Sequence, residues 1–262
     1  MEKTLKKLVD QARQAPASRA CARHALACMD LTSLDGNDTD EKIIDLCARA
    51  NGPAGRVAAV CVYGRFVPLA CRKLAGTGVK VASVCNFPHG GADAHAAVTE
   101  ARVLVASGAD EVDVVLPYKR YMAGDEDRAV SFIEQIRSAC GEKALLKVIL
   151  ETSQIQSLRM IESASRDVIL AGADFIKTST GKVPGGAQLD VAATMLSVIA
   201  DMQPRVDRPL GFKPSGGIRT VAQAAGYLHL ADSIMGQDWA NPDTFRFGAS
   251  SLLDDVLDML GR

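Results

Sequence analysis

Short apolar stretches, separated by amphipathic helical patterns, recur along nearly the whole chain and constrain its fold more than any other feature. Two of them, VAAVCV and ALLKVIL, are almost continuously apolar. Such runs are typical of strands covered on both faces, as in a parallel sheet. The predicted strands span residues 26–31, 57–62, 79–85, 111–116, 144–151, 174–178, 209–213 and 246–248.

The stretches between these strands show helix start and stop signals. Asp38, with Glu41 three residues later, predicts a capped helix start, and Gly108 predicts a helix end. Eight strands that alternate with helices over about 240 residues predict an α/β protein with a (β/α)8 TIM barrel. The predicted helices span residues 38–50, 92–108, 125–140, 154–171, 186–202 and 219–229.

A doubly wound open sheet is the alternative fold. It favours a glycine-rich nucleotide loop after the first strand, and MDLTSLDGNDTD is not such a loop. The sequence also lacks a low-complexity linker and a sharp shift in composition. We therefore expect one barrel domain over residues 1–262, with residues 1–25 as a helical extension ahead of the barrel.

The charge balance argues against several classes of partner. A formal net charge of -1 and a pI of about 6.4 give no basic field to attract nucleic acid or an acidic membrane. No apolar run reaches the ~20 residues of a membrane span, and the first residues lack the apolar core of a signal peptide. Neither the cysteines nor the histidines show metal-ligand spacing. We expect a soluble, cytoplasmic protein without a metal.

Charged residues interrupt four strands that should otherwise be apolar. Strand alternation places Asp113, Lys147, Lys177 and Lys213 on inward faces, so that they converge in the lumen. Lysine is rarely buried without a partner, and Lys177 and Lys213 end their strands where barrel active sites lie. The two lysines could instead face water, but the glycine-rich segments that follow both of them favour a site.

Two neighbouring lysines in a barrel suggest amine chemistry. A lysine with its reference pKa of ~10.4 is almost wholly charged at neutral pH. Desolvation and a second ammonium both lower the pKa, and the neutral amine can then attack a carbonyl to form an imine. The protonated imine withdraws electrons from a neighbouring C–C bond. Asp113 is the natural acid or base for the proton transfers.

The segments after the last three strands suggest a phosphorylated substrate. Gly216 and Gly217 let backbone N–H groups approach an anion, and Gly248, Ser250 and Ser251 would lie at a helix N-terminus, where phosphate is favoured. The loops after strands 7 and 8 are also the usual phosphate site of a barrel.

Seven motifs spread over the chain, from about residue 30 to residue 253, identify a known family. They are MDLTSL, NFPHG, GADEVDVVLPY, LLKVILET, AGADFIKTSTGK, GFKPSGGIR and RFGASSLL. Together they closely resemble the 2-deoxyribose-5-phosphate aldolases. The resemblance implies a class I aldolase on a (β/α)8 barrel that cleaves 2-deoxy-D-ribose 5-phosphate reversibly to D-glyceraldehyde 3-phosphate and acetaldehyde, without metal or cofactor. It further implies small-molecule phosphosugar and aldehyde substrates, a place in deoxyribonucleoside catabolism and a homodimer.

The resemblance also implies roles for individual residues. Lys177 matches the Schiff-base lysine and Lys213 the lysine that perturbs it. Asp113 matches the acid/base aspartate, with Lys147 as its partner. The matched substrate and phosphate contacts are Gly181, Lys182, Gly216, Gly217, Ser250 and Ser251, and the matched pocket residues are Asp30, Thr32 and Cys61.

Two other functions stay open on the residues alone. A phosphosugar isomerase on the same barrel would transfer protons without an imine, and a non-catalytic barrel would only bind the phosphosugar. One departure concerns the C-terminal tyrosine tail of some family members. The sequence here ends in LDMLGR, so we expect that role to be vacant or filled by water.

Overall fold

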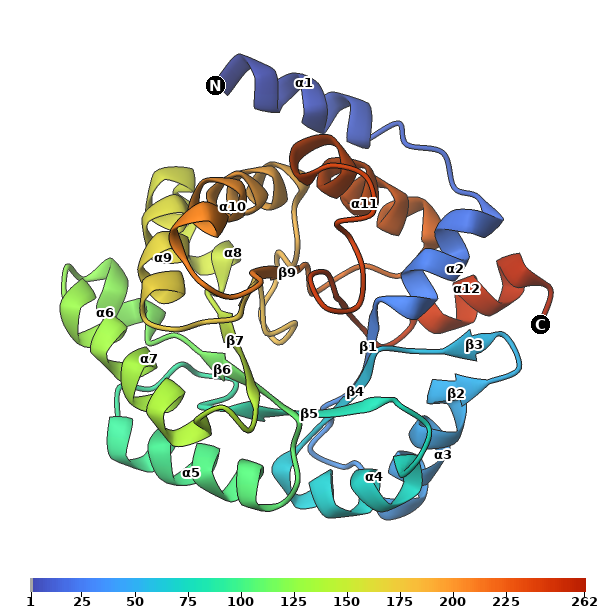
Figure 1. Cartoon of the computed structure of the whole chain (residues 1–262), viewed down its shortest axis with the longest axis horizontal. Helices are drawn as coiled ribbons and strands as arrows, with labels where there is room; N and C mark the ends of the chain where they lie inside the picture. The colour runs from blue at the N-terminus through green and yellow to red at the C-terminus, as the bar shows by residue number, and fades with distance from the viewer. Residues whose placement is uncertain (1) are drawn as a thin grey trace.

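The computed structural model describes residues 2–262 and shows parallel strands around a lumen, with helices on the outside (Figure 1). Within these residues the strands form one eight-stranded sheet in the order β10-β1-β4-β5-β6-β7-β8-β9. The predicted (β/α)8 barrel is confirmed, and the doubly wound alternative is wrong. The strands are β1 (Met29–Ser33), β4 (Ala59–Val62), β5 (Lys80–Cys85), β6 (Glu111–Val115), β7 (Leu145–Ile149), β8 (Phe175–Lys177), β9 (Gly211–Lys213) and β10 (Phe247–Ala249).

The barrel closes between β9 and β10, where the two strands and their flanks meet in isolated bridges. The backbone N–H of Phe212 donates to Thr244 at 2.8 Å, and the N–H of Arg246 donates back to Phe212 at 3.0 Å. The N–H of Gly248 donates to Pro214 at 3.0 Å. These alternating bonds follow the pattern of a parallel pair, so the last strand is held beside its neighbour.

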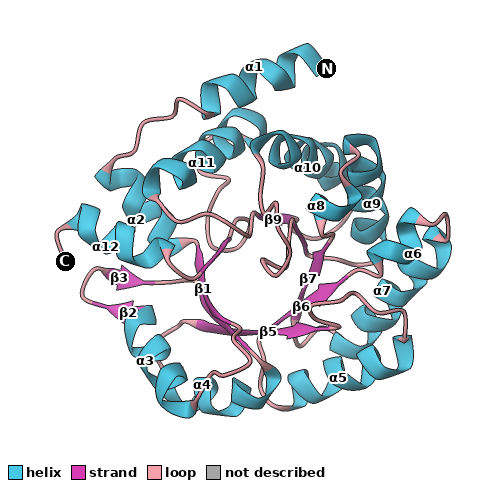
Figure 2. Ribbon diagram, turned by 180° about the vertical axis from the view of Figure 1, so that it is seen from behind, coloured by secondary structure: helices cyan, strands magenta, loops and turns pink. Residues whose placement is uncertain are grey.

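Helices cover the outer face of the barrel, as the view from the opposite side shows (Figure 2). Their buried apolar stripes pack on strands whose residues are nearly all buried, which explains the continuous apolar runs. None of the helices in residues 2–262 combines the length and apolar character needed to cross a membrane. The outer helices are α3 (Asp40–Ala50), α4 (Val67–Leu74), α5 (Ala94–Ala106), α7 (Glu126–Cys140), α9 (Leu158–Leu170), α10 (Leu189–Met202), α11 (Val221–Met235) and α12 (Leu252–Leu260).

Shorter elements complete the connections. The hairpin of β2 (Asn51–Gly52) and β3 (Gly55–Arg56) joins α3 to β4. The remaining short pieces are α6 (Tyr118–Met122), α8 (Thr152–Ile155) and the 3₁₀ turns η1 (Gly64–Phe66) and η2 (Gln203–Arg205).

The predicted N-terminal extension is confirmed as two helices, α1 (Glu2–Ala12) and α2 (Arg19–Ala27). Helix α1 packs across α10 and α11 (Figure 1). Gly226 of α11 permits this close crossing, because a Cβ there would lie 2.9 Å from the carbonyl oxygen of Ala12. Helix α2 packs against α11 and α12 and leads directly into β1.

Several predicted boundaries are wrong, and the helix predicted for residues 219–229 continues as α11 to Met235. The first strand begins at Met29 rather than at residue 26, because α2 continues to Ala27. The helix predicted for residues 154–171 is split into α8 and α9, with Gln156 between them at a φ of 57°. Such a left-handed backbone cannot continue an α-helix.

Asp38 is not the cap of α3. Thr39 is the N-cap, and its side chain accepts from the backbone N–H of Lys42. Asp38 is buried, and its carboxylate accepts from the hydroxyl of Ser33 at 2.9 Å and from the N–H of Asp35 at 3.0 Å. It thus braces the loop after β1, which borders the lumen.

Gly211 makes room for an aromatic ring in the lumen. A Cβ at Gly211 would lie 2.3–2.4 Å from atoms of the Phe175 ring, its register partner. We expect Gly211→Ala to lower the free energy of unfolding by about 1–3 kcal/mol, because the ring must move within a packed interior. Urea unfolding followed by circular dichroism measures this. Gly36→Ala is the matched control, since nothing lies within 4 Å of its Cβ position. Equal stability of the two variants would contradict the prediction.

Candidate functional site

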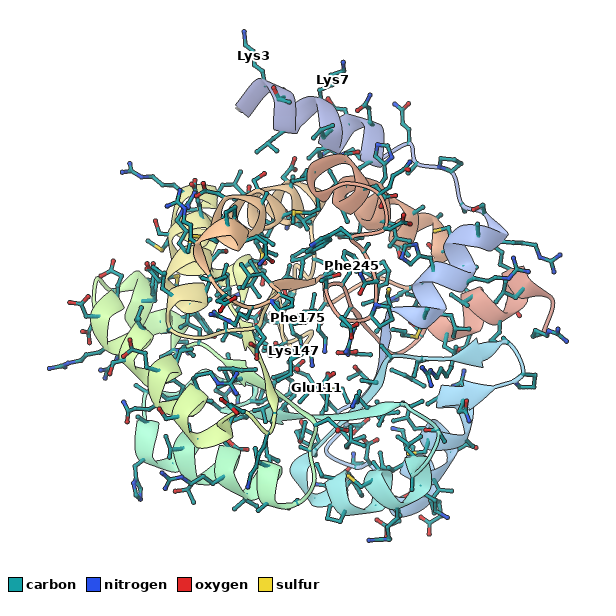
Figure 3. All side chains as sticks on the ribbon, viewed as in Figure 1. Lys3, Lys7, Glu111, Lys147, Phe175 and Phe245 are labelled. Atoms are coloured by element: carbon teal, nitrogen blue, oxygen red, sulfur yellow. The ribbon has the colours of Figure 1, made fainter. Side chains whose placement is uncertain are left out.

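Seven charged side chains meet inside the barrel, and we call them the lumen network. All are buried, and each comes from a strand or from the residue just before one. Figure 3 shows two of them, Lys147 and Glu111, near the middle of the barrel beside Phe175. The network comprises Asp30 of β1, Glu111 and Asp113 of β6, Lys147 of β7, Lys177 of β8, Lys213 of β9 and Arg246 before β10.

Asp113 lies at the centre of this network. Its Oδ1 accepts from Lys147 Nζ at 2.9 Å. Its Oδ2 accepts from both Lys177 Nζ at 2.8 Å and Lys213 Nζ at 2.7 Å. The two lysines that end β8 and β9 therefore share one oxygen atom. Burial alone would raise the pKa of Asp113, but the three ammonium groups outweigh it and hold that pKa well below its usual range.

The two strand-end lysines differ in how readily they lose a proton. Burial lowers the pKa of Lys177; Asp113 opposes this and the nearby charge of Lys213 adds to it, so the pKa falls below its ordinary value. Burial also disfavours the charge on Lys213. Its contacts with Asp113 and Asp30 outweigh burial and raise its pKa. Lys177 is therefore the better candidate for a neutral amine.

Arg246 and Glu111 belong to the part of the network that does not line the cavity. Arg246 donates to Glu111 Oε1 and to Asp30 Oδ1, each at 2.7 Å, and Lys147 also bonds to Glu111. The guanidinium lies 5.8 Å from the centre of the Phe175 ring. Arg246 begins a predicted strand, but neither it nor Glu111 is among the residues predicted for the site. The bidentate match of arginine with carboxylate is the signal that could have linked them.

Cys61 of β4 faces the lumen beside the network. It packs with Leu34, Ala82 and Val84 in a small apolar cluster that is separate from the main core. Burial raises the pKa of its thiol to about 11, so the sulfur is not ionised at neutral pH. The wall formed by β4 and β5 is thus apolar, whereas β6 to β9 supply charge.

A cavity of about 230 Å³ opens at the carboxyl ends of the strands. Lys177 lines it, whereas Asp30, Asp113, Lys147 and Lys213 of the network, and also Cys61, do not. Lys177 therefore joins the ionic network below to the cavity above. The other sequence-predicted residues that line the cavity are Thr32, Gly181, Lys182, Gly216, Gly217, Gly248, Ser250 and Ser251.

The cavity rim is well suited to an anion. Gly216 and Gly217 have φ values of 92° and 80°, a left-handed turn that side chains rarely adopt. Ser251 is the N-cap of α12, so the positive end of that helix faces the same rim. Arg219 also lines the cavity and is not among the predicted site residues, although it ends the GFKPSGGIR motif.

Buried hydrogen bonds hold the loop that carries Lys182. Glu151 Oε2 accepts from the N–H of Thr180 at 3.2 Å and from its hydroxyl at 2.5 Å. The Thr180 hydroxyl accepts in turn from the N–H of Lys182 at 3.1 Å. Lys182 Nζ donates to the carbonyl of Leu34 at 2.5 Å across the cavity mouth. Burial raises the pKa of Glu151, which the sequence analysis did not single out.

A larger hollow of about 840 Å³ lies at the amino ends of the strands and includes Arg137, Asp174 and Arg208 among its lining residues. The two arginines there contact Asp174 and carbonyl groups at helix and strand ends. None of the residues that line this hollow belongs to the lumen network. The smaller cavity is the candidate site because a network amine opens into it.

Comparison with known proteins finds matches over nearly the whole chain. A family model described as DeoC/LacD family aldolase matches residues 24–257. A Coccidioides immitis protein assigned as a deoxyribose-phosphate aldolase is 28% identical, with 97% of each chain covered and a TM-score of 0.77. The tetrameric deoxyribose phosphate aldolase of Aeropyrum pernix is 25% identical, covers 98% of this chain and 97% of its own, and has a TM-score of 0.75. A Toxoplasma gondii protein with the same assignment, 23% identical over 93% of this chain and 95% of its own, shares the fold with a TM-score of 0.85.

Proposed function

The chain belongs to the DeoC/LacD family of aldolases, and from that premise we propose that it is a class I aldolase for 2-deoxy-D-ribose 5-phosphate. The products are D-glyceraldehyde 3-phosphate and acetaldehyde, and the reaction is reversible. One observation carries the proposal. Lys177, whose pKa is lowered by burial, is the network amine that opens into a cavity suited to an anion.

The reaction begins at Lys177. Its neutral Nζ attacks the C1 aldehyde of the open-chain sugar, and loss of water gives a protonated imine. Removal of the proton from the C3 hydroxyl then breaks the C2–C3 bond, releases the phosphorylated aldehyde and leaves an enamine on Lys177. Protonation of the enamine at C2 and hydrolysis of the resulting imine release acetaldehyde and restore the amine.

Asp113 serves these proton transfers as a relay. Lys147 and Lys213 stay charged beside it and hold it ionised in the resting protein, so it stores no proton there. When Lys177 becomes a protonated imine and then an enamine, the charge on its nitrogen atom changes, and this nitrogen lies next to Asp113 Oδ2. Asp113 can take up a proton in one step and return it in a later one, while the Lys213 ammonium, which donates to the same oxygen atom, stabilises the carboxylate between these transfers.

Arg219 and the glycine turn are proposed to bind the phosphate. We expect Arg219→Met to raise KM for 2-deoxyribose 5-phosphate by about 10–100-fold, because a charge-assisted hydrogen bond contributes about 1.5–3 kcal/mol. Reaction of unphosphorylated 2-deoxyribose should change little. Arg128→Met, on the exposed face of α7, is the control. Equal losses for both sugars would show that Arg219 does not recognise the phosphate.

Borohydride trapping tests the function itself. The protein is incubated with acetaldehyde or with the deoxysugar phosphate, reduced with borohydride and digested, and the peptides are weighed by mass spectrometry. An adduct on the Lys177 peptide is the expected result. Isomerase turnover without an adduct would assign a proton-transfer enzyme, and binding without either would assign a non-catalytic barrel.

The assembly state and location also stay predictions. We infer a homo-oligomer, supported by the tetramer of the Aeropyrum pernix protein. The expected homodimer and the cytoplasmic location would be checked by sedimentation and by fractionation of cells.

A further inference from the structure

The charges of the lumen network do not balance. Within residues 2–262 it holds three acids, Asp30, Glu111 and Asp113, all of them buried. It holds four bases: Lys147, Lys177, Lys213 and Arg246, which are equally buried. Full ionisation would leave one positive charge without a counter-charge in a dry lumen, and such a charge is strongly disfavoured. The favourable state is one in which one base has lost its proton.

The contacts decide which base is neutral. Lys147 lies within 4 Å of three acids, and Lys213 and Arg246 each contact two. Lys177 contacts Asp113 alone among the network acids, through the oxygen that Lys213 also uses. Arg246 cannot be the neutral member, because a guanidinium keeps its proton in proteins. The charged form of Lys177 is therefore stabilised by fewer acids than that of any other base in the network.

We propose that Arg246 is a positioning residue for the amine chemistry of Lys177, although it does not line the cavity. Its permanent charge, bound by Asp30 and Glu111, occupies acids that would otherwise balance the lysines. The lumen is thereby left one acid short, and Lys177 is the group that gives up its proton. This inference rests on the proposed function, in which Lys177 reacts as a neutral amine.

Few other titratable groups bear on this balance. Cys61 faces Lys177 from β4, but its raised thiol pKa keeps it uncharged. Glu151 follows β7 and accepts from Thr180 rather than from a network base; burial raises its pKa, and the charge of Lys177 opposes that rise. The inward residues of β5 that flank the network, Ala82 and Val84, carry no charge. On the cavity side, Lys182 and Arg219 line the same cavity as Lys177, and both are basic.

The pH dependence of borohydride trapping with acetaldehyde tests the proposal. In Arg246→Met the lumen holds equal numbers of acids and bases, so Lys177 should keep its proton to higher pH. Fewer molecules are then neutral at a given pH, and the acid limb of the trapping profile should move up by roughly one pH unit. That is the effect of a unit charge about 10 Å away at an effective dielectric constant of about 20.

A second variant separates charge from structure. Arg246→Met combined with Glu111→Gln removes one base and one acid, which restores the excess of one base. Its acid limb should return to within about 0.3 pH unit of the unchanged protein, a small part of the single-variant shift. Arg246→Lys keeps the charge and should likewise keep the profile. Should Arg246→Met fail to fold by circular dichroism, Arg246→Gln, whose amide still donates to Glu111, takes its place.

The outcomes are distinct. An unchanged profile in the single variant overturns the proposal. So does a double variant that shifts as far as the single one, because a structural role of Arg246 is not repaired by removing its partner. If the unchanged protein is not trapped at any pH, the proposed function itself fails and the role of Arg246 falls with it.

Discussion

Replacing Lys177 with methionine is expected to lower kcat/KM for the deoxysugar phosphate by at least about 10⁴-fold and to abolish trapping by borohydride. Without the amine no imine forms, and no other network amine lines the cavity within the described residues. The protein should still fold, because methionine fills similar volume and the remaining network has three acids and three bases.

A control variant and a stability measurement complete the test of Lys177→Met. Lys73→Met, on the exposed side of α4, is the matched control and should keep its activity. Thermal unfolding should show Lys177→Met to be at least as stable as the unchanged protein. Residual turnover above about one per cent, with an adduct on a different lysine, would mean that the nucleophile has been assigned to the wrong residue.

Lys213→Leu is expected to lower the trapping rate at pH 7 by about 100-fold, which corresponds to a rise of about two units in the pKa of Lys177. Lys213 shares an Asp113 oxygen with Lys177, so its charge acts at short range. Removing that charge leaves Asp113 to stabilise the Lys177 ammonium. The acid limb of the rate profile therefore moves to higher pH, and much of the loss should be recovered in alkaline buffer.

Lys213→Arg provides the control for charge. It keeps the cation and should move the acid limb less than Lys213→Leu does, even if the new geometry slows turnover. A Lys213→Leu protein that is slow at every pH, with an unmoved limb, would show that Lys213 transfers protons or orders Asp113 without setting the pKa of Lys177.

The inward-facing charges could be predicted from the sequence because strand geometry is simple. Alternation of faces is fixed by the backbone, so Asp113, Lys147, Lys177 and Lys213 had to share the lumen once the barrel was recognised. Their register follows: Asp113 pairs with Lys147, and Lys177 pairs with Lys213.

Arg246 could not be assigned to the lumen in the same way. It is the first residue of the predicted strand and lies just before β10 in the structure, where alternation fixes the direction of a side chain least. Its partners Asp30 and Glu111 come from strands far away in the sequence. Side-chain partners across a closed barrel depend on rotamers and distances that no single strand reveals.

Local competition explains the boundary errors. Asp38 and Thr39 can each cap a helix, and Thr39 does so because Asp38 is engaged by Ser33 and Asp35. The break at Gln156 carries no proline or glycine that would announce it. At Asp38, side-chain contacts within the loop choose between two caps that local preference leaves nearly equal.

The strands hold the lumen network, whereas glycine-rich turns line the mouth of the cavity. Lys177 belongs to the network and also lines the cavity. The residues that set the reactivity of the amine thus lie in the strands, and those that select the substrate lie in the turns above them. A protein engineer who reshapes the glycine turns and the start of α12 can change which aldehyde is admitted, while the electrostatic setting that makes one amine reactive stays as it is.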